Sequence, residues 1–246
     1  MSDVSDVSPG GAPPRDVLIC IPTYNEAGNI GPITSAILER CPQVHILVID
    51  DGSPDGTGQL ADALAADDAR IHVMHRTSKE GLGRAYIAGF AWALEQGFEK
   101  IVEMDADFSH RPEDLPELLK QLDHFDVVIG SRYVAGGATK DWGIFRRLLS
   151  RGGGFYARLV LEVDIRDLIA GFVGWRRKVL ETIDLDRIEA SGYVFQIELK
   201  YRAHQKGFRI LEVPIIFPDR LVGDSKMTPD IAAEALTRIW KIRLKR

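Results

Sequence analysis

The sequence predicts an α/β fold with a mostly parallel central sheet flanked by helices. Two patterns support this prediction, namely short apolar runs and helical segments that follow them in regular alternation. The apolar runs lie at 17–21, 44–49, 71–74, 100–104 and 126–130, and the helical segments lie near 27–40, 57–68, 83–96 and 112–122. Strands and helices that alternate in this way are typical of a parallel sheet.

The pattern changes in the second half of the chain, after residue 135. There the sequence predicts a glycine-rich loop, a basic and aromatic helix near 144–162, an apolar stretch at 168–175, a helix near 194–206 and a strand near 209–217. At the N-terminus, residues 1–14 have hardly an apolar side chain, so we expect a disordered leader there.

Composition excludes several classes of protein. With 246 residues and 45% hydrophobic content, the chain suits one catalytic domain, and its net charge of −5 argues against a nucleic-acid binder. No apolar run reaches the roughly 18 to 20 residues that span a bilayer, and no signal peptide pattern occurs. Cys20 and Cys41 lack the spacing of a metal or redox motif, so we expect buried, reduced thiols in a cytosolic protein.

Asp105-Ala106-Asp107 is the strongest single motif, because it directly follows an apolar run that predicts a buried strand. In an extended backbone, Asp105 and Asp107 would project to the same side, where two carboxylates repel unless a cation lies between them. Oxygen ligands of this kind suit Mg²⁺ or Mn²⁺, which proteins often hold with one or two carboxylates and substrate phosphates. The alternative is an ordinary solvated turn.

Two other predicted strands end in polar sequence. The first runs into Pro22-Thr23-Tyr24-Asn25-Glu26 and the second into Asp50-Asp51-Gly52-Ser53. Ligands of parallel sheets bind outside the carboxyl ends of the strands, so we expect one cleft there, with Asp51 available to a base or a ribose. Neither the dinucleotide fingerprint nor the P-loop pattern occurs, which argues against hydride transfer and P-loop hydrolysis. Asp55 and Thr57, by contrast, are explained without a ligand by a turn that caps the next helix.

These three motifs, in this order and spacing, resemble the inverting GT-A glycosyltransferases of the second family. Four further motifs resemble those of the polyprenol-phosphate (dolichyl-phosphate) mannosyltransferases within it. They are Gly130-Ser131-Arg132-Tyr133, Ser150-Arg151-Gly152, Gly192-Tyr193-Val194-Phe195-Gln196, and Glu212-Val213-Pro214 through Asp219-Arg220. The resemblance covers nearly everything from Val17 to about Met227.

The resemblance implies a GT-A-type nucleotide-diphospho-sugar transferase fold that transfers mannose from GDP-mannose to a polyprenyl monophosphate with Mg²⁺ or Mn²⁺. It places Pro22, Tyr24, Glu26, Ile49 and Asp51 around the guanosine, and Asp105, Ala106 and Asp107 at the diphosphate and metal, with Ser109 as a further metal ligand to test. Arg220 and Lys226 match residues that clamp the donor phosphates, and Arg132, Arg146 and Ser150 match positions at the acceptor phosphate. It further implies one GT-A catalytic domain at 15–230, divided into a nucleotide and metal half at 15–130 and an acceptor half at 131–230.

The charge of the acceptor has a mechanistic consequence. A phosphate monoester oxygen is already ionised near neutral pH, so it needs no base to attack an anomeric carbon. We therefore name Asp107 and Arg132 as the catalytic residues, the first through the metal and the second, with Arg146, by reducing repulsion between two anionic substrates. His110, beside the metal motif, is expected to be structural.

A polyprenyl phosphate lies in a bilayer, so the enzyme has to reach the membrane surface. Residues 231–246 predict a basic amphipathic C-terminal helix, with an apolar stripe that includes Ile239 and Trp240. The segment 142–161, with Leu148, Leu149 and Tyr156 among arginines, is a second candidate contact. These features predict a cytoplasmic protein that is peripheral on the cytoplasmic face of a membrane, with a separate anchoring protein left open as a partner. The alternative is that both helices pack against the core.

Several activities stay open at this point. The same fold serves UDP-glucose as donor with a polyprenyl phosphate, or a sugar hydroxyl as acceptor. A non-enzymatic nucleotide-binding scaffold and a nucleotidyltransferase are more distant alternatives. The former would not need the acidic pair, and the latter typically carries a glycine-rich loop where this chain has Pro22-Thr23-Tyr24-Asn25-Glu26.

Overall fold

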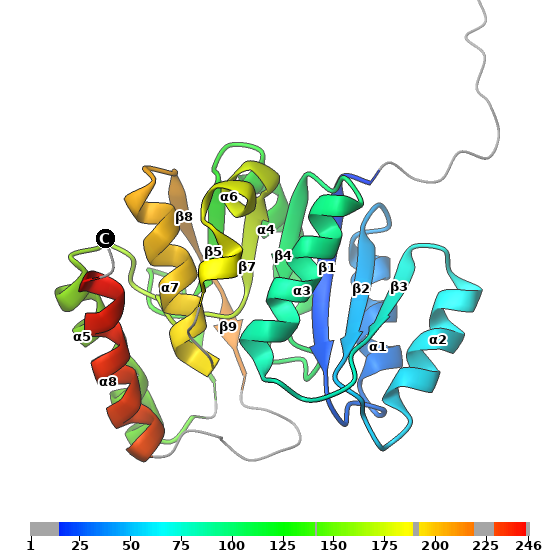
Figure 1. The fold of residues 1–246 in the computed structure, drawn as a ribbon, viewed down its shortest axis with the longest axis horizontal. Helices are drawn as coiled ribbons and strands as arrows, with labels where there is room; N and C mark the ends of the chain where they lie inside the picture. Colours follow the sequence, from blue (N-terminus) through cyan, green and yellow to red (C-terminus); the bar gives the residue numbers. More distant parts are fainter. Residues whose placement is uncertain (1–14, 141, 189–191, 219–228, 245–246) are drawn as a thin grey trace, which may run out of the picture.

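The structure, a computed structural model, describes residues 15–140, 142–188, 192–218 and 229–244. Its centre is a seven-stranded sheet with the order β3-β2-β1-β4-β7-β5-β8 (Figure 1). The strands are β1 Val17–Thr23, β2 His45–Asp50, β3 Ile71–His75, β4 Lys100–Glu103, β5 Val127–Ser131, β7 Val173–Arg176 and β8 Ile210–Pro214. Within this sheet, only the pairings of β7 with β4 and β5 are antiparallel. The predicted mostly parallel sheet is confirmed.

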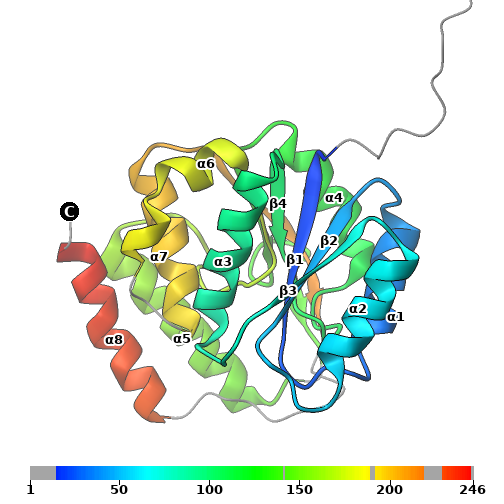
Figure 2. The same cartoon turned by 45° about the vertical axis from the view of Figure 1, so that its right-hand side comes forward.

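Helices cover both faces of the sheet, with α3, α6 and α7 on one face and α1, α2 and α4 on the other (Figures 1 and 2). Their bounds are α1 Ile30–Arg40, α2 Thr57–Asp67, α3 Leu82–Glu95, α4 Leu115–Leu122, α5 Ile144–Leu161, α6 Arg177–Thr182, α7 Gly192–Gln205 and α8 Pro229–Leu244. Short 3-10 turns lie at Pro112–Asp114 and Leu185–Arg187, and β6 Ala138–Thr139 pairs with β9 Ile216–Phe217. Helices α5 and α8 pack together beside α7, at one end of the molecule.

The strand sequences are apolar on both faces because both faces are covered. In β1, Leu18 and Cys20 belong to the core under α3, while Ile19 and Ile21 belong to the core under α1. Helix α3 approaches the sheet closely at Gly89, where a Cβ would lie 2.6 Å from Cδ1 of Ile49. The core therefore continues on each side of a sheet whose carboxyl edge is left for polar loops.

The first half of the chain follows the sequence prediction, since all five strands and all four helices occur within a few residues of their expected positions. The second half differs in detail. Only the end of the apolar stretch 168–175 becomes a strand, and the strand predicted near 209–217 is interrupted at Ile215. Helix α6 and strand β6 have no counterpart among the predicted elements, whereas β9 lies at the end of the strand predicted near 209–217. The sequence predicted that the last helix begins at residue 231, whereas α8 begins at Pro229.

The two cysteines are buried and unpaired, as predicted, and burial raises the pKa of both thiols. None of the helices in the described part of the chain is both long and apolar enough to span a bilayer. The predicted leader at 1–14 and the final two residues lie outside the described residues.

Candidate functional site

The polar strand ends meet at one edge of the sheet, the lower edge in Figure 1. Thr23 at the end of β1 is in register with Asp50 at the end of β2, and the amide of Asp51 donates to the Thr23 carbonyl at 3.1 Å. On the other side of β1, the amide of Met104 donates to the carbonyl of Cys20 at 3.1 Å. The carboxyl ends of three adjacent parallel strands therefore meet at this edge, where the cleft is expected.

The loops after β1 and β2 are tied together by side chains. The amide of Asn25, which has a φ of 61°, donates to Ser53 Oγ at 3.0 Å, and the amide of Glu26 donates to Thr57 Oγ1 at 2.9 Å. Asp55 accepts from the Thr57 hydroxyl at 2.6 Å and from its amide at 3.1 Å. The hydroxyl bond lowers the pKa of Asp55. Asp55 and Thr57 thus build the turn before α2, in agreement with the structural interpretation of these two residues in the sequence analysis.

Asp51 is buried and pairs with a basic residue that the sequence analysis did not select. Its Oδ1 lies 2.6 Å from Nη1 of Arg76, whose Nη2 also contacts Glu80 at 2.8 Å. Burial raises the pKa of Asp51, and the Arg76 charge opposes that rise. The ion pair occupies one oxygen of the Asp51 carboxylate. The sequence signal that could have identified Arg76 is its position just after the third apolar run, at 71–74.

The other residues expected to contact the donor differ in their exposure and in their partners. Tyr24 is partly exposed, and Nζ of Lys79 lies 3.7 Å from its ring centroid, in cation–π geometry. The side chain of Ile49 is fully buried against α3, so it is not exposed at the end of β2. Glu26 accepts a hydrogen bond from Nδ2 of Asn29 at 2.7 Å. Pro22 lies within β1 itself.

The acidic pair lies on a turn and not on an extended strand. Strand β4 ends at Glu103, and bends at 106–110 follow, with Phe108 at a φ of 60°. The strand period used in the sequence argument therefore does not apply beyond Met104. Instead, Oδ1 of Asp107 accepts a hydrogen bond from the Ser109 amide at 3.0 Å. Ala106 is buried, while Asp105 and Asp107 are partly exposed at the edge.

The buried ring of His110 is hydrogen-bonded to the backbone of this turn. Its Nδ1 accepts a hydrogen bond from the Asp105 amide at 2.9 Å, so the ring is neutral with its proton on Nε2. The 3.9 Å approach of the same nitrogen to Asp105 Oδ2 is therefore not a charged pair. The ring is buried and stacks on Phe172 with a centroid distance of 5.3 Å. This arrangement agrees with the structural role expected for His110.

The turn fits a hard divalent cation by its donor set. Asp105 and Asp107 supply carboxylate oxygens, and Ser109 Oγ is buried without a hydrogen-bond partner among the described residues. An orphaned hydroxyl beside two carboxylates suits Mg²⁺ or Mn²⁺. Within the described residues, no group of three or more His, Cys, Asp or Glu side chains forms a metal site. A metal here would rely on substrate phosphate oxygens to complete its coordination.

Arg132 follows β5 at the same edge and is held by a buried acid. Its Nε and Nη2 lie 2.8 and 2.6 Å from the two carboxylate oxygens of Asp167, and its amide donates to the same side chain at 3.0 Å. The guanidinium also lies 5.2 to 5.4 Å from the rings of Tyr133, Trp142 and Phe217. Arg132 is thus a rigid group with one fixed orientation.

Ser150 lies close to this arginine, because its Oγ accepts a hydrogen bond from the Tyr133 hydroxyl at 2.7 Å. The guanidinium of Arg151 lies 5.6 Å from the ring of the same tyrosine. The structure therefore brings two of the three predicted acceptor residues together. The side chain of Arg146, as well as Arg220 and Lys226, lies outside the described part of the molecule.

Two solved structures of one other enzyme have a fold similar to that of this chain. The structure of glucosyl-3-phosphoglycerate synthase from Mycobacterium tuberculosis with phosphoglyceric acid aligns with a TM-score of 0.66 at 18% identity, covering 94% of this chain and 79% of that one. The complex of that enzyme with Mn²⁺, uridine diphosphate and glucosyl-3-phosphoglycerate aligns with a TM-score of 0.65 at 19% identity, with the same coverage. The predicted GT-A-type fold is confirmed.

Closer similarity comes from two bacterial proteins. Polyprenol monophosphomannose synthase of Mycolicibacterium smegmatis is 52% identical over 235 residues, covering 94% of this chain and 89% of that protein. Undecaprenyl-phosphate mannosyltransferase of Micrococcus luteus is 47% identical over 225 residues, covering 92% and 93%. Residues 18–184 match the family described as Glycosyl transferase family 2. The chain is a glycosyltransferase and belongs to glycosyl transferase family 2.

Proposed function

We propose that this enzyme transfers mannose from GDP-mannose to a polyprenyl monophosphate, with inversion at the anomeric carbon and with Mg²⁺ or Mn²⁺. The observation that carries the proposal is the single polar edge of the sheet, where Asp51, the Asp105 and Asp107 turn, and Arg132 follow the carboxyl ends of parallel strands. The names of the two bacterial relatives, which cover nearly all of the chain, support mannose as the sugar and a polyprenyl phosphate as the acceptor.

The donor side is assigned to the loops after β1 and β2 and to the acidic turn. Asp51, held by Arg76, accepts from the base, and Tyr24 offers a ring face. Pro22, Glu26, Ile49 and Ala106 complete the proposed donor contacts, and Arg220 and Lys226 are assigned to the donor phosphates. A divalent cation bound by Asp105 and Asp107 would stabilise the negative charge that develops on the leaving diphosphate.

The acceptor side is assigned to Arg132, Arg146 and Ser150. An acceptor phosphate oxygen forms the new bond to the anomeric carbon as the bond from that carbon to the diphosphate breaks, and the electron pair leaves with GDP. Because the attacking oxygen is already ionised, no side chain has to remove a proton. The arginines reduce the repulsion between two anionic substrates, and the fixed orientation of Arg132 limits the entropy lost at that step.

The face of α5 supports a peripheral position on a membrane, which we assign to the cytoplasmic side. Leu148, Phe155 and Leu159 are 65%, 65% and 67% exposed on this helix, and Arg151 and Arg158 lie among them. On α8, Trp240 is 51% exposed, whereas Ile239 is buried in the core. Exposed apolar side chains among basic ones suit the head-group region of a bilayer that contains anionic lipids. A separate anchoring protein would be a further partner on this face.

A donor competition tests the proposal. The protein is incubated with a polyprenyl phosphate, a soluble sugar acceptor, Mn²⁺, and equal amounts of GDP-mannose and UDP-glucose carrying different isotopes, and the lipid is extracted into organic solvent. Mannose label in the lipid phase supports the proposal. Glucose label alone would establish the glucosyltransferase alternative, and label that stays in water on a soluble sugar acceptor would establish a hydroxyl acceptor.

A further inference from the structure

A fully buried lysine lies under the acceptor side of the site. Lys200, on α7, donates from Nζ to the carbonyls of Leu168 and Ala170 at 3.1 and 2.6 Å. The same nitrogen lies 3.0 Å from Oε1 of Gln196, one turn earlier on the helix. The carbonyl of Gln196 is a fourth, longer acceptor at 3.4 Å, so the three protons of the ammonium all have partners. The side chain is thus a clamp between α7 and the segment 167–171.

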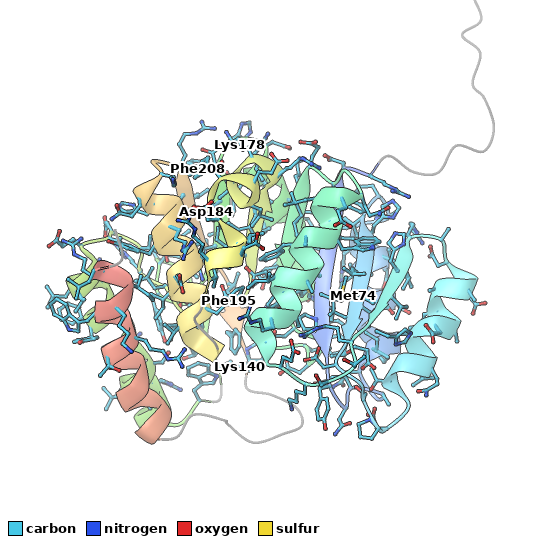
Figure 3. The ribbon with its side chains drawn as sticks, viewed as in Figure 1. Met74, Lys140, Lys178, Asp184, Phe195 and Phe208 are labelled. Carbon is cyan, nitrogen blue, oxygen red and sulfur yellow. The ribbon has the colours of Figure 1, made fainter. Side chains whose placement is uncertain are left out.

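The position of the ammonium is itself set by a buried acid. Glu103, the last residue of β4, accepts hydrogen bonds from Trp175 Nε1 at 2.7 Å and from the amide nitrogen of Gln196. The Gln196 amide therefore connects Glu103 to Lys200, with its nitrogen bound to the carboxylate and its oxygen bound to the ammonium. Neighbouring Phe195, which is labelled in Figure 3, lies near this end of α7, and its ring stacks on that of Tyr86 of α3.

The segment held by Lys200 is the one that holds Arg132. Asp167 makes three hydrogen bonds to Arg132, and its own amide donates to Oε1 of Glu212 at 2.9 Å. At the other end, the Phe172 carbonyl accepts from the Gly130 amide at 2.8 Å. Between these anchors, the segment depends on the Lys200 ammonium for the direction of two carbonyls. A shift of the segment would move Asp167 and with it the guanidinium.

Stability alone does not account for charged groups at these positions. Burial raises the pKa of Glu103 and lowers the pKa of Lys200, so both ions cost free energy that their mutual attraction only partly offsets. Apolar side chains of similar volume often replace such buried charges without loss of stability. A long, hydrogen-bonding cation does what an apolar chain cannot, which is to fix carbonyls on a neighbouring segment.

We propose that Lys200 is a positioning residue for the transfer reaction, which holds segment 167–171 so that Asp167 keeps Arg132 oriented toward the acceptor phosphate. The network of Glu103 and Gln196 sets the place of the ammonium. This role rests on the proposed function for its kinetic consequence, but the ordering of the segment can be measured without any substrate.

Lys200→Met tests the proposal against a matched control on the same helix. Arg202 also bridges α7 to a neighbouring segment, through the carbonyls of Ile183, Asp184 and Arg187, and none of these residues is assigned to the proposed site. We expect Lys200→Met to lower kcat/KM for the polyprenyl phosphate about tenfold to a hundredfold, with the affinity for GDP and Mn²⁺ within about twofold of wild type. Arg202→Met, compared at equal distance below its unfolding midpoint, is expected to retain kcat/KM.

Hydrogen exchange separates this role from a general loss of stability. Lys200→Met is expected to accelerate exchange of the amides of 167–171 beyond any change in the rest of the sheet, and Arg202→Met is expected not to do so. The double variant Glu103→Gln, Lys200→Met removes the uncompensated buried carboxylate, so it should recover stability without recovering kcat/KM. Recovery of both together, or equal kinetic loss in Arg202→Met, would overturn the proposal. If the wild-type protein transfers no mannose, the proposed function fails, while unchanged exchange at 167–171 would still refute the positioning role separately.

Discussion

The Asp105 amide donates to Nδ1 of His110 across 2.9 Å, and this bond links the acidic turn to the core. Because the ring accepts at Nδ1 and stacks on Phe172, it is held neutral and has no free lone pair with which to act as a base. The histidine nearest to the metal motif is thereby a support of the turn. This relationship distinguishes a structural imidazole from a catalytic one.

Substitution of His110 tests that distinction. His110→Asn can place its amide oxygen near the position of Nδ1 and accept from the same amide, whereas His110→Phe keeps the stacking and loses the acceptor. We expect His110→Asn to retain most transfer activity and His110→Phe to lose about tenfold or more, because an unsatisfied buried amide costs about 1 to 3 kcal/mol and displaces Asp105. Steady-state kinetics across pH measure both. Loss of activity in His110→Asn with intact donor and metal binding would indicate a chemical role instead.

Asp107 should act only through metal and donor. Asp107→Asn is expected to lower transfer at least about a hundredfold and to weaken Mn²⁺-dependent binding of GDP, since the turn loses one of its two carboxylates. Its unfolding midpoint should match the wild type, because the side chain is partly exposed. Asp62→Asn, an exposed carboxylate on α2 that contacts His75, is the matched control and should leave transfer unchanged. Full activity of Asp107→Asn with metal-independent GDP binding would refute the assignment.

The Arg132 and Asp167 pair is expected to be essential for stability as well as for transfer. Asp167→Asn leaves a buried guanidinium without its counter-ion, and breaking such a pair costs about 3 to 5 kcal/mol. The double variant Arg132→Met, Asp167→Leu removes both charges and should recover much of the unfolding free energy while transfer stays lost. Urea unfolding and the organic-phase assay measure the two effects. A double variant that transfers mannose normally would show that Arg132 has no part at the acceptor.

Acid stability should depend on Asp68, away from the site. Its hydrogen bonds to Arg70 lower its pKa from 3.8 to about 2. A lowered pKa means that the stabilisation is complete above the unfolded pKa and is lost as pH falls through 3.8 toward about 2. Asp68→Asn should therefore lower the unfolding free energy by about 1 kcal/mol at pH 6, after allowance for solvent screening, and by much less at pH 2. Exposed Asp186→Asn provides the control, and a pH-independent loss would exclude the ion pair as the cause.

Membrane binding is best tested by exposed side chains and not by truncation. Removal of 231–246 would also delete buried Ile239, so reduced binding could reflect unfolding. Leu148→Ser, Phe155→Ser and Leu159→Ser combined, or Trp240→Ser alone, remove exposed apolar surface only. We expect the triple variant to bind anionic vesicles about tenfold more weakly at unchanged stability. Unchanged binding of both variants would leave α5 and α8 as ordinary core-packed helices.

The sequence predicted the first half of the fold well, because β1 to β5 and α1 to α4 carry local periodicity that tertiary packing then uses. It did not predict where β7 pairs, since an antiparallel strand between β4 and β5 is a long-range choice with no local signal. Asp51 and the acidic turn were selected from their place after strands, and the structure places both at the same edge of the sheet. Arg76 and Lys79 were not selected as site residues in the sequence analysis. They follow β3, an edge strand, and no motif there indicated contact with a ligand.

Helix α7 shows most clearly what one sequence conceals. Gln196, Glu198 and Lys200 are polar or charged residues of this helix, yet all three are buried. Their burial depends on partners distant in the chain, such as Glu103 on β4 and the carbonyls after Asp167. A charged residue in a helix predicts exposure by default, and only the assembled structure reveals the exceptions.

The most direct test of the account is the lipid product itself. Wild-type protein, isotope-labelled GDP-mannose and a polyprenyl phosphate are incubated with Mn²⁺, with a chelator, and with the chelator followed by excess Mn²⁺, and the organic phase is analysed by mass and by NMR of the anomeric centre. The account predicts a polyprenyl phosphate that carries one mannose in inverted configuration, lost with the chelator and restored by the metal. Absence of that lipid under all three conditions, or retained configuration in the product, would contradict it.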